Sequence, residues 1–134
     1  MKNILVLMPV EAKHKEKLEA TGTGCRFVYS TSGHVSKEEI QSANIILGQP
    51  KAEMLAASQN LEWLQLESAG ADDYIVPGVL NEKTILTNAT GAYSKAVSEH
   101  GFALTLMLQK KLYLYRDEQR KSPCGRIRTT THES

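Results

Sequence analysis

The sequence is poor in cysteine and in aromatic residues, and its charges almost balance. Its 134 residues include two cysteines, 6% aromatic residues and a formal net charge of +1. Neither the cysteines, Cys25 and Cys124, nor any pair of histidines has the spacing of metal ligands, so we predict no metal site. A net charge this close to zero gives no electrostatic reason to expect binding to nucleic acid or to an anionic membrane.

Long hydrophobic runs are also absent. The longest nearly apolar stretch, Gly101 to Leu108, is far shorter than a membrane-spanning helix. The apolar run at the N-terminus, Ile4 to Met8, is too short for a signal peptide, and Pro9 and Glu11 follow it. We therefore expect no membrane segment and no secretion signal, and we expect a cytoplasmic protein whose two thiols are reduced.

The signatures of a dinucleotide site and of a catalytic centre are missing as well. No Gly-x-Gly-x-x-Gly occurs, and the glycine pair of Thr21-Gly22-Thr23-Gly24 follows a predicted helix and precedes a predicted strand, the reverse of the fingerprint. His100 lies inside an apolar helical stretch with no Ser, Cys or Asp at a triad spacing, so we assign it a structural or interface role. We expect no catalytic residue in this chain and no cofactor bound by the chain alone.

What the sequence does contain is a regular alternation of short apolar runs and helix-forming segments. The runs with strand character are Ile4 to Met8, Cys25 to Tyr29, Ile45 to Leu47, Glu62 to Leu66 and Thr84 to Thr87. The helical segments between them are Val10 to Ala20, Ser36 to Ala43, which opens on a capping box, and Ala52 to Ser58. The alternation predicts an α/β fold, a flavodoxin-like parallel sheet of order 2-1-3-4-5 with helices on both faces.

The rest of the chain differs from this first part, residues 1–93. Residues 94–121 predict one long C-terminal helix of about 28 residues. Phe102, Leu106 and Leu114 lie off its main apolar stripe, so the helix needs more than one partner, and we expect a homodimer or a further domain there. Residues 122–134 have no apolar period, and we expect a disordered or vector-derived tail after a truncation.

The fold class also predicts where a ligand binds. Open parallel sheets bind ligands beyond the carboxyl ends of their strands. This places Gly48, Ala69, Gly70 and Tyr93 around one crevice as candidate substrate-binding residues. For Gly48 and Gly70 the alternative is a tight turn without a ligand, and for Tyr93 it is a side chain that covers the start of the helix.

Three motifs together resemble the N-terminal substrate domain of the D-isomer-specific 2-hydroxyacid dehydrogenases, over roughly residues 1–121. They are Ser68-Ala69-Gly70-Ala71-Asp72 after a strand, Thr87-Asn88-Ala89-Thr90-Gly91 about twenty residues later, and Ser98-Glu99-His100 in the long helix. The resemblance implies that the backbone amides at Ala69 and Gly70 hold a substrate carboxylate. It also implies that the parent enzyme uses NAD or NADP to oxidise a small D-2-hydroxyacid or reduce the 2-oxo acid.

In that family the catalytic His, its acidic partner and the substrate-binding Arg lie downstream, so the resemblance implies a fragment that is inactive by itself. Two other users of the fold are excluded by the ends of the first and third strands. Met8-Pro9 and Gly48-Gln49-Pro50 provide no acid for a phosphoacceptor domain, and Pro9 to Lys13 lacks the hydroxyl- and glycine-rich loop of a flavodoxin. The remaining alternative is a non-catalytic module that binds a metabolite or a protein.

Overall fold

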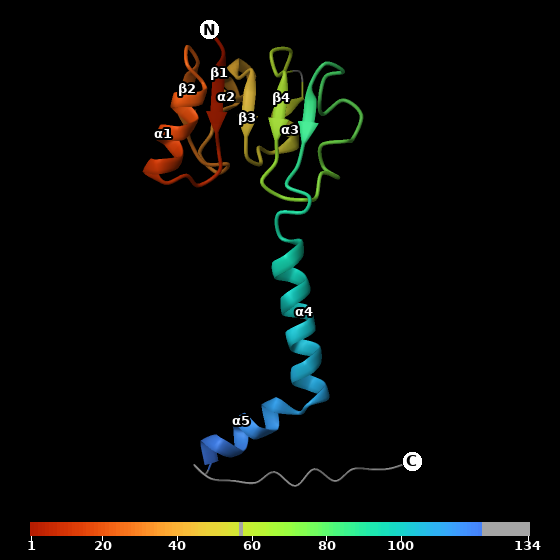
Figure 1. Ribbon diagram of the computed structural model, residues 1–134. Helices are drawn as coiled ribbons and strands as arrows, with labels where there is room; N and C mark the ends of the chain where they lie inside the picture. The colour runs from red at the N-terminus through yellow and green to blue at the C-terminus, as the bar shows by residue number, and fades with distance from the viewer. Residues whose placement is uncertain (57, 122–134) are drawn as a thin grey trace. The chain divides into compact units, whose positions relative to one another are not determined.

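A computed structural model describes residues 1–56 and 58–121 of the chain. The chain divides into two compact units, the first from Met1 to Ala92 and the second beginning at Tyr93. The first unit is a layered α/β domain, and the described part of the second is helical (Figure 1). The predicted tail over residues 122–134, which includes Cys124, lies outside the described residues.

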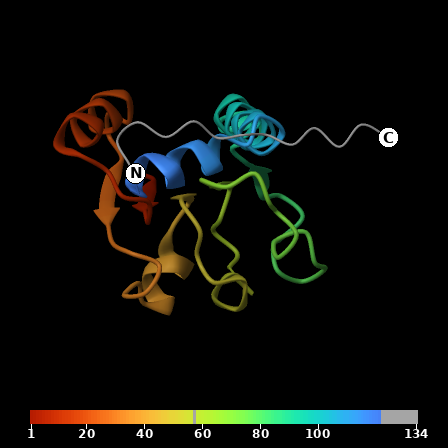
Figure 2. The ribbon, with the colours of Figure 1, turned by 90° about the horizontal axis from the view of Figure 1, so that it is seen from below.

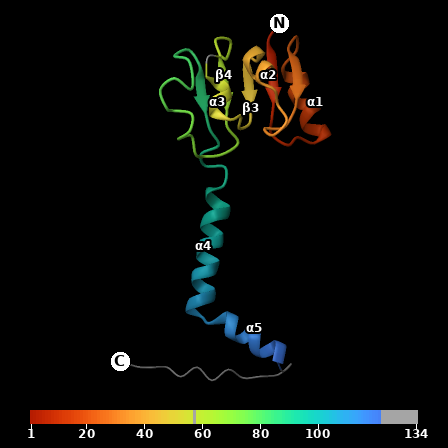
Figure 3. The same ribbon diagram turned by 180° about the vertical axis from the view of Figure 1, so that it is seen from behind.

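The first unit is built on a parallel sheet of five strands in the order β2-β1-β3-β4-β5. Figures 1 and 3 show the strands side by side, with β2 and β5 at the edges. Their bounds are Asn3–Val6 for β1, Arg26–Tyr29 for β2, Ile45–Leu47 for β3, Trp63–Gln65 for β4 and Ile85–Thr87 for β5. The predicted fold class and strand order are confirmed.

Three helices connect the first four strands. They are α1 at Ala12–Thr21, α2 at Lys37–Ser42 and α3 at Ala52–Leu55. The predicted capping box begins α2, because the Ser36 hydroxyl accepts from the Glu39 N–H and the Glu39 carboxylate accepts from the Ser36 N–H. The third helix is shorter than predicted, because Ala56 already has an extended ψ of 128°.

The core lies between the sheet and the pair α2 and α3. Alternate strand residues point to this face, as the period of two requires. The fully buried side chains of this core come from three strands and two helices, and include Leu5, Ile46, Leu64, Ile40 and Leu55. The two helices lie on the face of the sheet opposite α1 (Figure 2).

The face that carries α1 is only partly covered within the first unit. One register row crosses this face from strand to strand, in the order Phe27, Ile4, Ile45, Trp63 and Ile85. Ile4 is buried beside α1, whereas Trp63 is 37% exposed and Ile85 is 62% exposed. An apolar hollow of about 330 Å³ lies along this row, lined by Ile4, Leu18, Phe27, Ile45, Leu47 and Trp63, among others.

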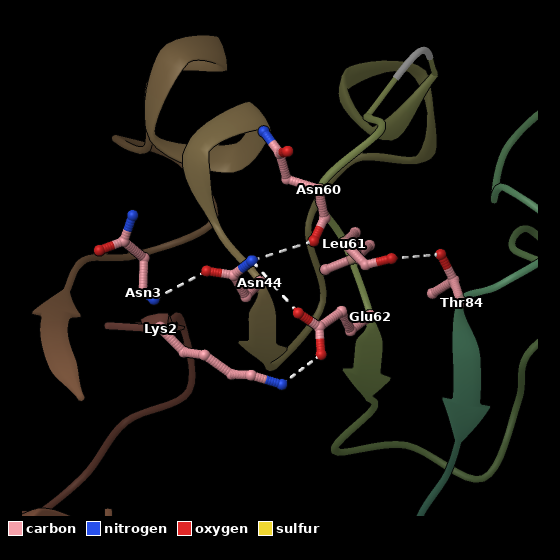
Figure 4. A network of polar contacts seen from close by, with 7 residues as sticks. All are labelled: Lys2, Asn3, Asn44, Asn60, Leu61, Glu62 and Thr84. Carbon is pink, nitrogen blue, oxygen red and sulfur yellow. Dashed lines mark hydrogen bonds and ion pairs between the residues drawn. The ribbon is translucent and has the colours of Figure 1, made fainter. Parts of the chain in front are cut away.

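A polar network joins the amino ends of four strands, at the edge of the sheet opposite the one predicted to bind a ligand (Figure 4). The Asn44 side chain accepts from the Asn3 N–H at 2.9 Å and donates to the Asn60 carbonyl at 3.3 Å. The Glu62 carboxylate pairs with the Lys2 ammonium, and the Thr84 hydroxyl donates to the Leu61 carbonyl at 2.7 Å. These contacts hold the strand starts in register. They involve none of the loops at the carboxyl ends of the strands.

The part of the second unit that the structure describes, up to residue 121, contains two helices, α4 at Ser94–Gln109 and α5 at Leu112–Lys121. The sequence predicted one continuous helix over residues 94–121, and this detail was wrong. Lys111 has a left-handed φ of 54°, and Lys110 donates to the Leu106 carbonyl, as at a helix C-terminus. Across the described part of the chain, the helices are too short or too polar to cross a membrane.

Candidate functional site

The candidate site lies at the carboxyl ends of β3, β4 and β5, where three loops meet (Figure 1). The loop after β3 contains Gly48 and Gln49, the loop after β4 contains residues 68–71, and the loop after β5 begins at Asn88. A hollow of about 390 Å³ opens between the last two loops, lined by Ala71, Leu86, Thr87 and Asn88. Parallel strands bring these loops together although they are far apart in sequence.

Gly48 is required by packing. Its φ is +127°, and an added Cβ would lie 2.9 Å from both the Leu7 Cβ and the Met8 nitrogen. Gly48 is buried, and its N–H donates to the Gln65 carbonyl at 2.9 Å. These contacts explain the glycine without a ligand, so a substrate contact by Gly48 stays a prediction.

Gly70 has the opposite surroundings. An added Cβ would meet no heavy atom within 4 Å, and Gly70 is exposed, as is Ala69. The neighbouring packing therefore does not require a glycine here. Open space beside an exposed backbone is what close approach of a ligand needs.

In the loop after β4, four successive carbonyl groups, from Ser68 to Ala71, accept hydrogen bonds. The Ser68 carbonyl accepts from the Ala89 N–H at 2.9 Å, and the Ala69 carbonyl accepts from the Asn88 side-chain amide at 2.7 Å. The Gly70 carbonyl accepts from the Ser68 hydroxyl at 3.0 Å, and the Ala71 carbonyl accepts from the Tyr74 N–H at 2.9 Å. Each carbonyl from Ser68 to Ala71 thus accepts a hydrogen bond from a donor in the chain.

Three N–H groups of the same loop, unlike its carbonyl groups, make no hydrogen bonds within the described residues. They are the N–H groups of Ala69, Gly70 and Ala71. In a trans peptide the N–H points away from the carbonyl of the same group. Each of the three N–H groups therefore points away from the donor that its own peptide carbonyl accepts from. Successive N–H groups without a protein acceptor can hold an anion.

Charged side chains around these amides are acidic. Glu67, Asp72 and Asp73 flank the loop, and the segments 66–74 and 86–93 contain no Lys, Arg or His. Within these segments only the backbone dipoles attract an anion, and the negative charge of the acidic side chains repels it. A cation supplied by residues outside these segments would strengthen the binding of a carboxylate here.

Tyr74 anchors the end of the loop. Its hydroxyl donates to the Pro50 carbonyl at 2.7 Å, and the side chain is 7% exposed. Burial raises the pKa of Tyr74, and the nearby negative charges of Asp73 and Glu67 raise it further. The phenol is therefore neutral at ordinary pH and acts as a fixed hydrogen-bond donor.

Two remaining candidates of the sequence lie in the second unit. Tyr93 is the N-cap residue of α4, is 59% exposed and makes no side-chain cap hydrogen bond. His100 lies within α4 and is exposed. Substrate contact by Tyr93 and an interface role for His100 stay predictions. In the described part of the chain, no group of three or more His, Cys, Asp or Glu is placed to hold a metal ion.

Sequence reasoning placed Gln49 in the loop that lines the predicted crevice and Asn88 in a motif of the family resemblance, but it gave neither side chain a role. The Gln49 side-chain amide donates to the Ser68 hydroxyl at 2.9 Å, which links the loops after β3 and β4. The signal for Asn88 was present, because an Asn directly after a strand and before small residues favours a side-chain turn. Its contact with Ala69 depends on a neighbouring loop and has no local signature.

Comparison with known proteins now bears on this architecture. No family model matches the chain. Over 80 residues the chain is 34% identical to an uncharacterised protein in the proB 3′ region of Corynebacterium melassecola. The matched residues make up 59% of this chain and 26% of that protein.

The structural comparison is more extensive. The crystal structure of a D-isomer specific 2-hydroxyacid dehydrogenase family protein from Aeromonas salmonicida is similar to 97% of this chain, with a TM-score of 0.76 and 25% identity. The resemblance to the D-isomer-specific 2-hydroxyacid dehydrogenases is thereby confirmed. The chain spans 42% of the length of that dehydrogenase.

Other solved dehydrogenases of this kind have the same fold at lower identity. D-lactate dehydrogenase from Aquifex aeolicus, complexed with NAD and lactic acid, is 20% identical with a TM-score of 0.67, and the match covers 94% of this chain and 39% of that enzyme. Phosphoglycerate dehydrogenase from Lactobacillus plantarum is also 20% identical, with a TM-score of 0.54, and the match covers 96% and 42% of the two chains. The described chain thus corresponds to less than half of such a dehydrogenase.

Proposed function

We propose that this chain is the substrate-binding part of an NAD- or NADP-dependent oxidoreductase that acts on the CH–OH group of small D-2-hydroxyacids or on the matching 2-oxo acids. The observation that carries the proposal is that the successive N–H groups of Ala69, Gly70 and Ala71 donate no hydrogen bond within the described residues and lie beside an open hollow. Backbone amides arranged in this way suit the carboxylate that every 2-hydroxyacid carries.

The residues described here do not fit a nicotinamide dinucleotide. The loop from β1 to α1 has no glycine, and the acidic Glu11 is the N-cap of α1, where a pyrophosphate would need to bind. The glycines after α1 precede a strand instead of a helix. In this proposal the cofactor, the proton-transferring His and a substrate-binding Arg belong to residues outside this chain. The chain alone binds and orients the carboxylate and is inactive.

Titration of the isotope-labelled chain with pyruvate, followed by NMR, tests the proposal. We expect the amide resonances of Gly70 and Ala71 to shift saturably, because a carboxylate accepts hydrogen bonds from these groups. The neutral analogue pyruvamide controls for charge and should leave these resonances in place. Shifts confined to other residues would contradict the proposed carboxylate site.

The source gene distinguishes the dehydrogenase from the alternative, a non-catalytic binding module. A reading frame that continues with a Gly-x-Gly-x-x-Gly after a further strand supports the dehydrogenase, and a stop codon directly after Ser134 supports the module. For the chain by itself, calorimetry with NADH should give no saturable heat at micromolar concentrations. Saturable binding would contradict the division of roles proposed here.

We further propose that the protein is cytoplasmic and pairs with a second copy through α4. Within the second unit no residue of α4 is buried, and Val97, Phe102 and Leu108 are each more than 60% exposed. These residues are distributed around the helix axis, so one neighbouring surface cannot cover them all. A second copy provides a matching apolar surface by symmetry.

A further inference from the structure

The orientation of the N–H groups of Ala69, Gly70 and Ala71 is controlled by side chains that would not touch the substrate themselves. We propose that Asn88 and Gln49 are positioning residues, which hold the peptide groups between Ser68 and Ala71 with their N–H groups toward a carboxylate. The inference rests on the proposed function, because it assigns a role to side chains around the same site. The side chains of residues 68–71 are small and uncharged. The loop therefore attracts an anion if its N–H groups face the ligand and a cation if its carbonyl groups do.

Asn88 is held at both ends of its side-chain amide. The Nδ2 group donates to the Ala69 carbonyl at 2.7 Å, and the Oδ1 atom accepts from the Thr90 N–H at 3.3 Å. The reversed orientation would place two acceptors together at Ala69 and two donors together at Thr90, so the chemistry selects one orientation. Asn88 therefore couples the loop after β5 to the peptide group that joins Ala69 to Gly70.

Gln49 acts through a hydroxyl. Its Nε2 group donates to the Ser68 hydroxyl at 2.9 Å, and that hydroxyl donates to the Gly70 carbonyl at 3.0 Å. A hydroxyl has one proton, so a donor on its oxygen leaves that proton for the other partner. Gln49 thereby directs the Ser68 proton to Gly70 and fixes the peptide group that joins Gly70 to Ala71.

The base of this arrangement is rigid. Gly48, next to Gln49, is buried against the segment that follows β1 and donates to the Gln65 carbonyl. The Pro50 carbonyl accepts from the buried Tyr74 hydroxyl at 2.7 Å. Gln49 is therefore placed by contacts on both sides. A side chain on a fixed base orients its partner more precisely than one on a free loop.

The consequence for a ligand follows from the charges. If a peptide group of this loop rotated, its carbonyl oxygen would replace the N–H and would repel a carboxylate, in a segment already flanked by Glu67, Asp72 and Asp73. The two side chains thus determine the sign of the local field at the site. Loss of either should weaken binding without removing an atom that contacts the ligand.

The test compares variants of the chain by the same pyruvate titration. Asn88→Ala removes the contact to Ala69, and Gln49→Met keeps the size of the side chain while removing the donor. We expect each to raise the dissociation constant, read from the Gly70 and Ala71 amides, by about fivefold or more. Asn88→Ser is a milder second variant, because its hydroxyl can still accept from Thr90 but is too short to reach Ala69.

Asn81→Ala is the matched control. Like Asn88, Asn81 joins separate segments through its side-chain amide, which donates to the carbonyls of Ser58 at 3.0 Å and Leu61 at 3.2 Å. Asn81 precedes β5 and lies away from the site. It should lower the melting temperature and leave pyruvate affinity unchanged. Thermal unfolding of every variant separates loss of fold from loss of orientation.

The outcomes separate the two proposals. If pyruvate does not shift Gly70 and Ala71 in the wild-type chain, the carboxylate site itself is overturned. If the wild-type chain binds and the folded Asn88 and Gln49 variants bind equally well, the positioning role is overturned and the site stands. If Asn81→Ala weakens binding as much as they do, the effect is general destabilisation and the positioning role is again overturned.

Discussion

The hydroxyl of Tyr74 donates a 2.7 Å hydrogen bond to the carbonyl oxygen of Pro50, which joins the loop after β4 to the loop after β3. Tyr74 is 7% exposed, so neither group has free access to water in the folded state. Removal of this hydroxyl would leave a buried carbonyl without a partner, which is the costly case for a hydrogen bond. The contribution of this hydrogen bond can therefore be measured as a change in the free energy of unfolding.

We predict that Tyr74→Phe lowers the free energy of unfolding by about 1–2 kcal/mol at neutral pH, measured by urea denaturation. The raised pKa of Tyr74 also makes this contribution depend on pH. The folded state keeps the phenol protonated above the ordinary value of 10.0, so the stabilisation is present below that pH and is lost as pH rises through the folded pKa. The difference between wild type and variant should therefore narrow in strong alkali.

The matched control for that experiment is Tyr29→Phe. The Tyr29 hydroxyl donates to the exposed Glu19 carboxylate at 3.0 Å, so water can replace the partner. We expect a loss of under about 0.5 kcal/mol. Equal losses for the two variants would contradict a special role for Tyr74.

The two faces of the sheet should respond differently to truncation. Leu64 is 0% exposed in the core, and Leu64→Ala should cost about 2–5 kcal/mol. Ile85, in the register row of the partly covered face, is 62% exposed, and Ile85→Ala should cost under about 1 kcal/mol. Circular dichroism during urea denaturation measures both. A large loss for Ile85→Ala would mean that another part of the protein covers this face.

The two candidate glycines should separate stability from binding. Gly48→Ala forces a side chain into a left-handed backbone and 2.9 Å contacts with Leu7 and Met8, so we expect a loss of about 2 kcal/mol or more. Gly70→Val places its side chain in open space and should leave the melting temperature nearly unchanged while it abolishes the pyruvate-induced shift of Ala71. Wild-type pyruvate affinity in folded Gly70→Val would mean that Gly70 is only a turn residue.

The assembly proposal is tested by sedimentation at several concentrations. We expect a dimer whose dissociation is measurable at micromolar concentrations, because exposed apolar surface contributes about 25 cal/mol per Å² when it is buried. The double substitution Phe102→Ser and Leu106→Ser should shift the equilibrium to monomer. A wild-type chain that remains monomeric at about 100 μM, and a double variant of unchanged solubility, would contradict pairing through α4.

Several features of this protein were determined by its sequence alone. Short apolar runs separated by helical segments suffice to predict a parallel α/β sheet and its strand order, because a strand buried on two faces has a recognisable local composition. The capping box at Ser36 and Glu39 is likewise a contact between neighbours in sequence. The position of the candidate site followed from the strand order, since parallel strands end at one edge.

Other features were decided only by the tertiary structure. The need for glycine at Gly48 arises from the approach of Leu7, in the segment that follows β1. The contacts of Gln49 with Ser68 and of Asn88 with Ala69 each join residues 19 apart in sequence. Such contacts form only when the sheet brings separate loops together, so no local pattern specifies which way an amide points.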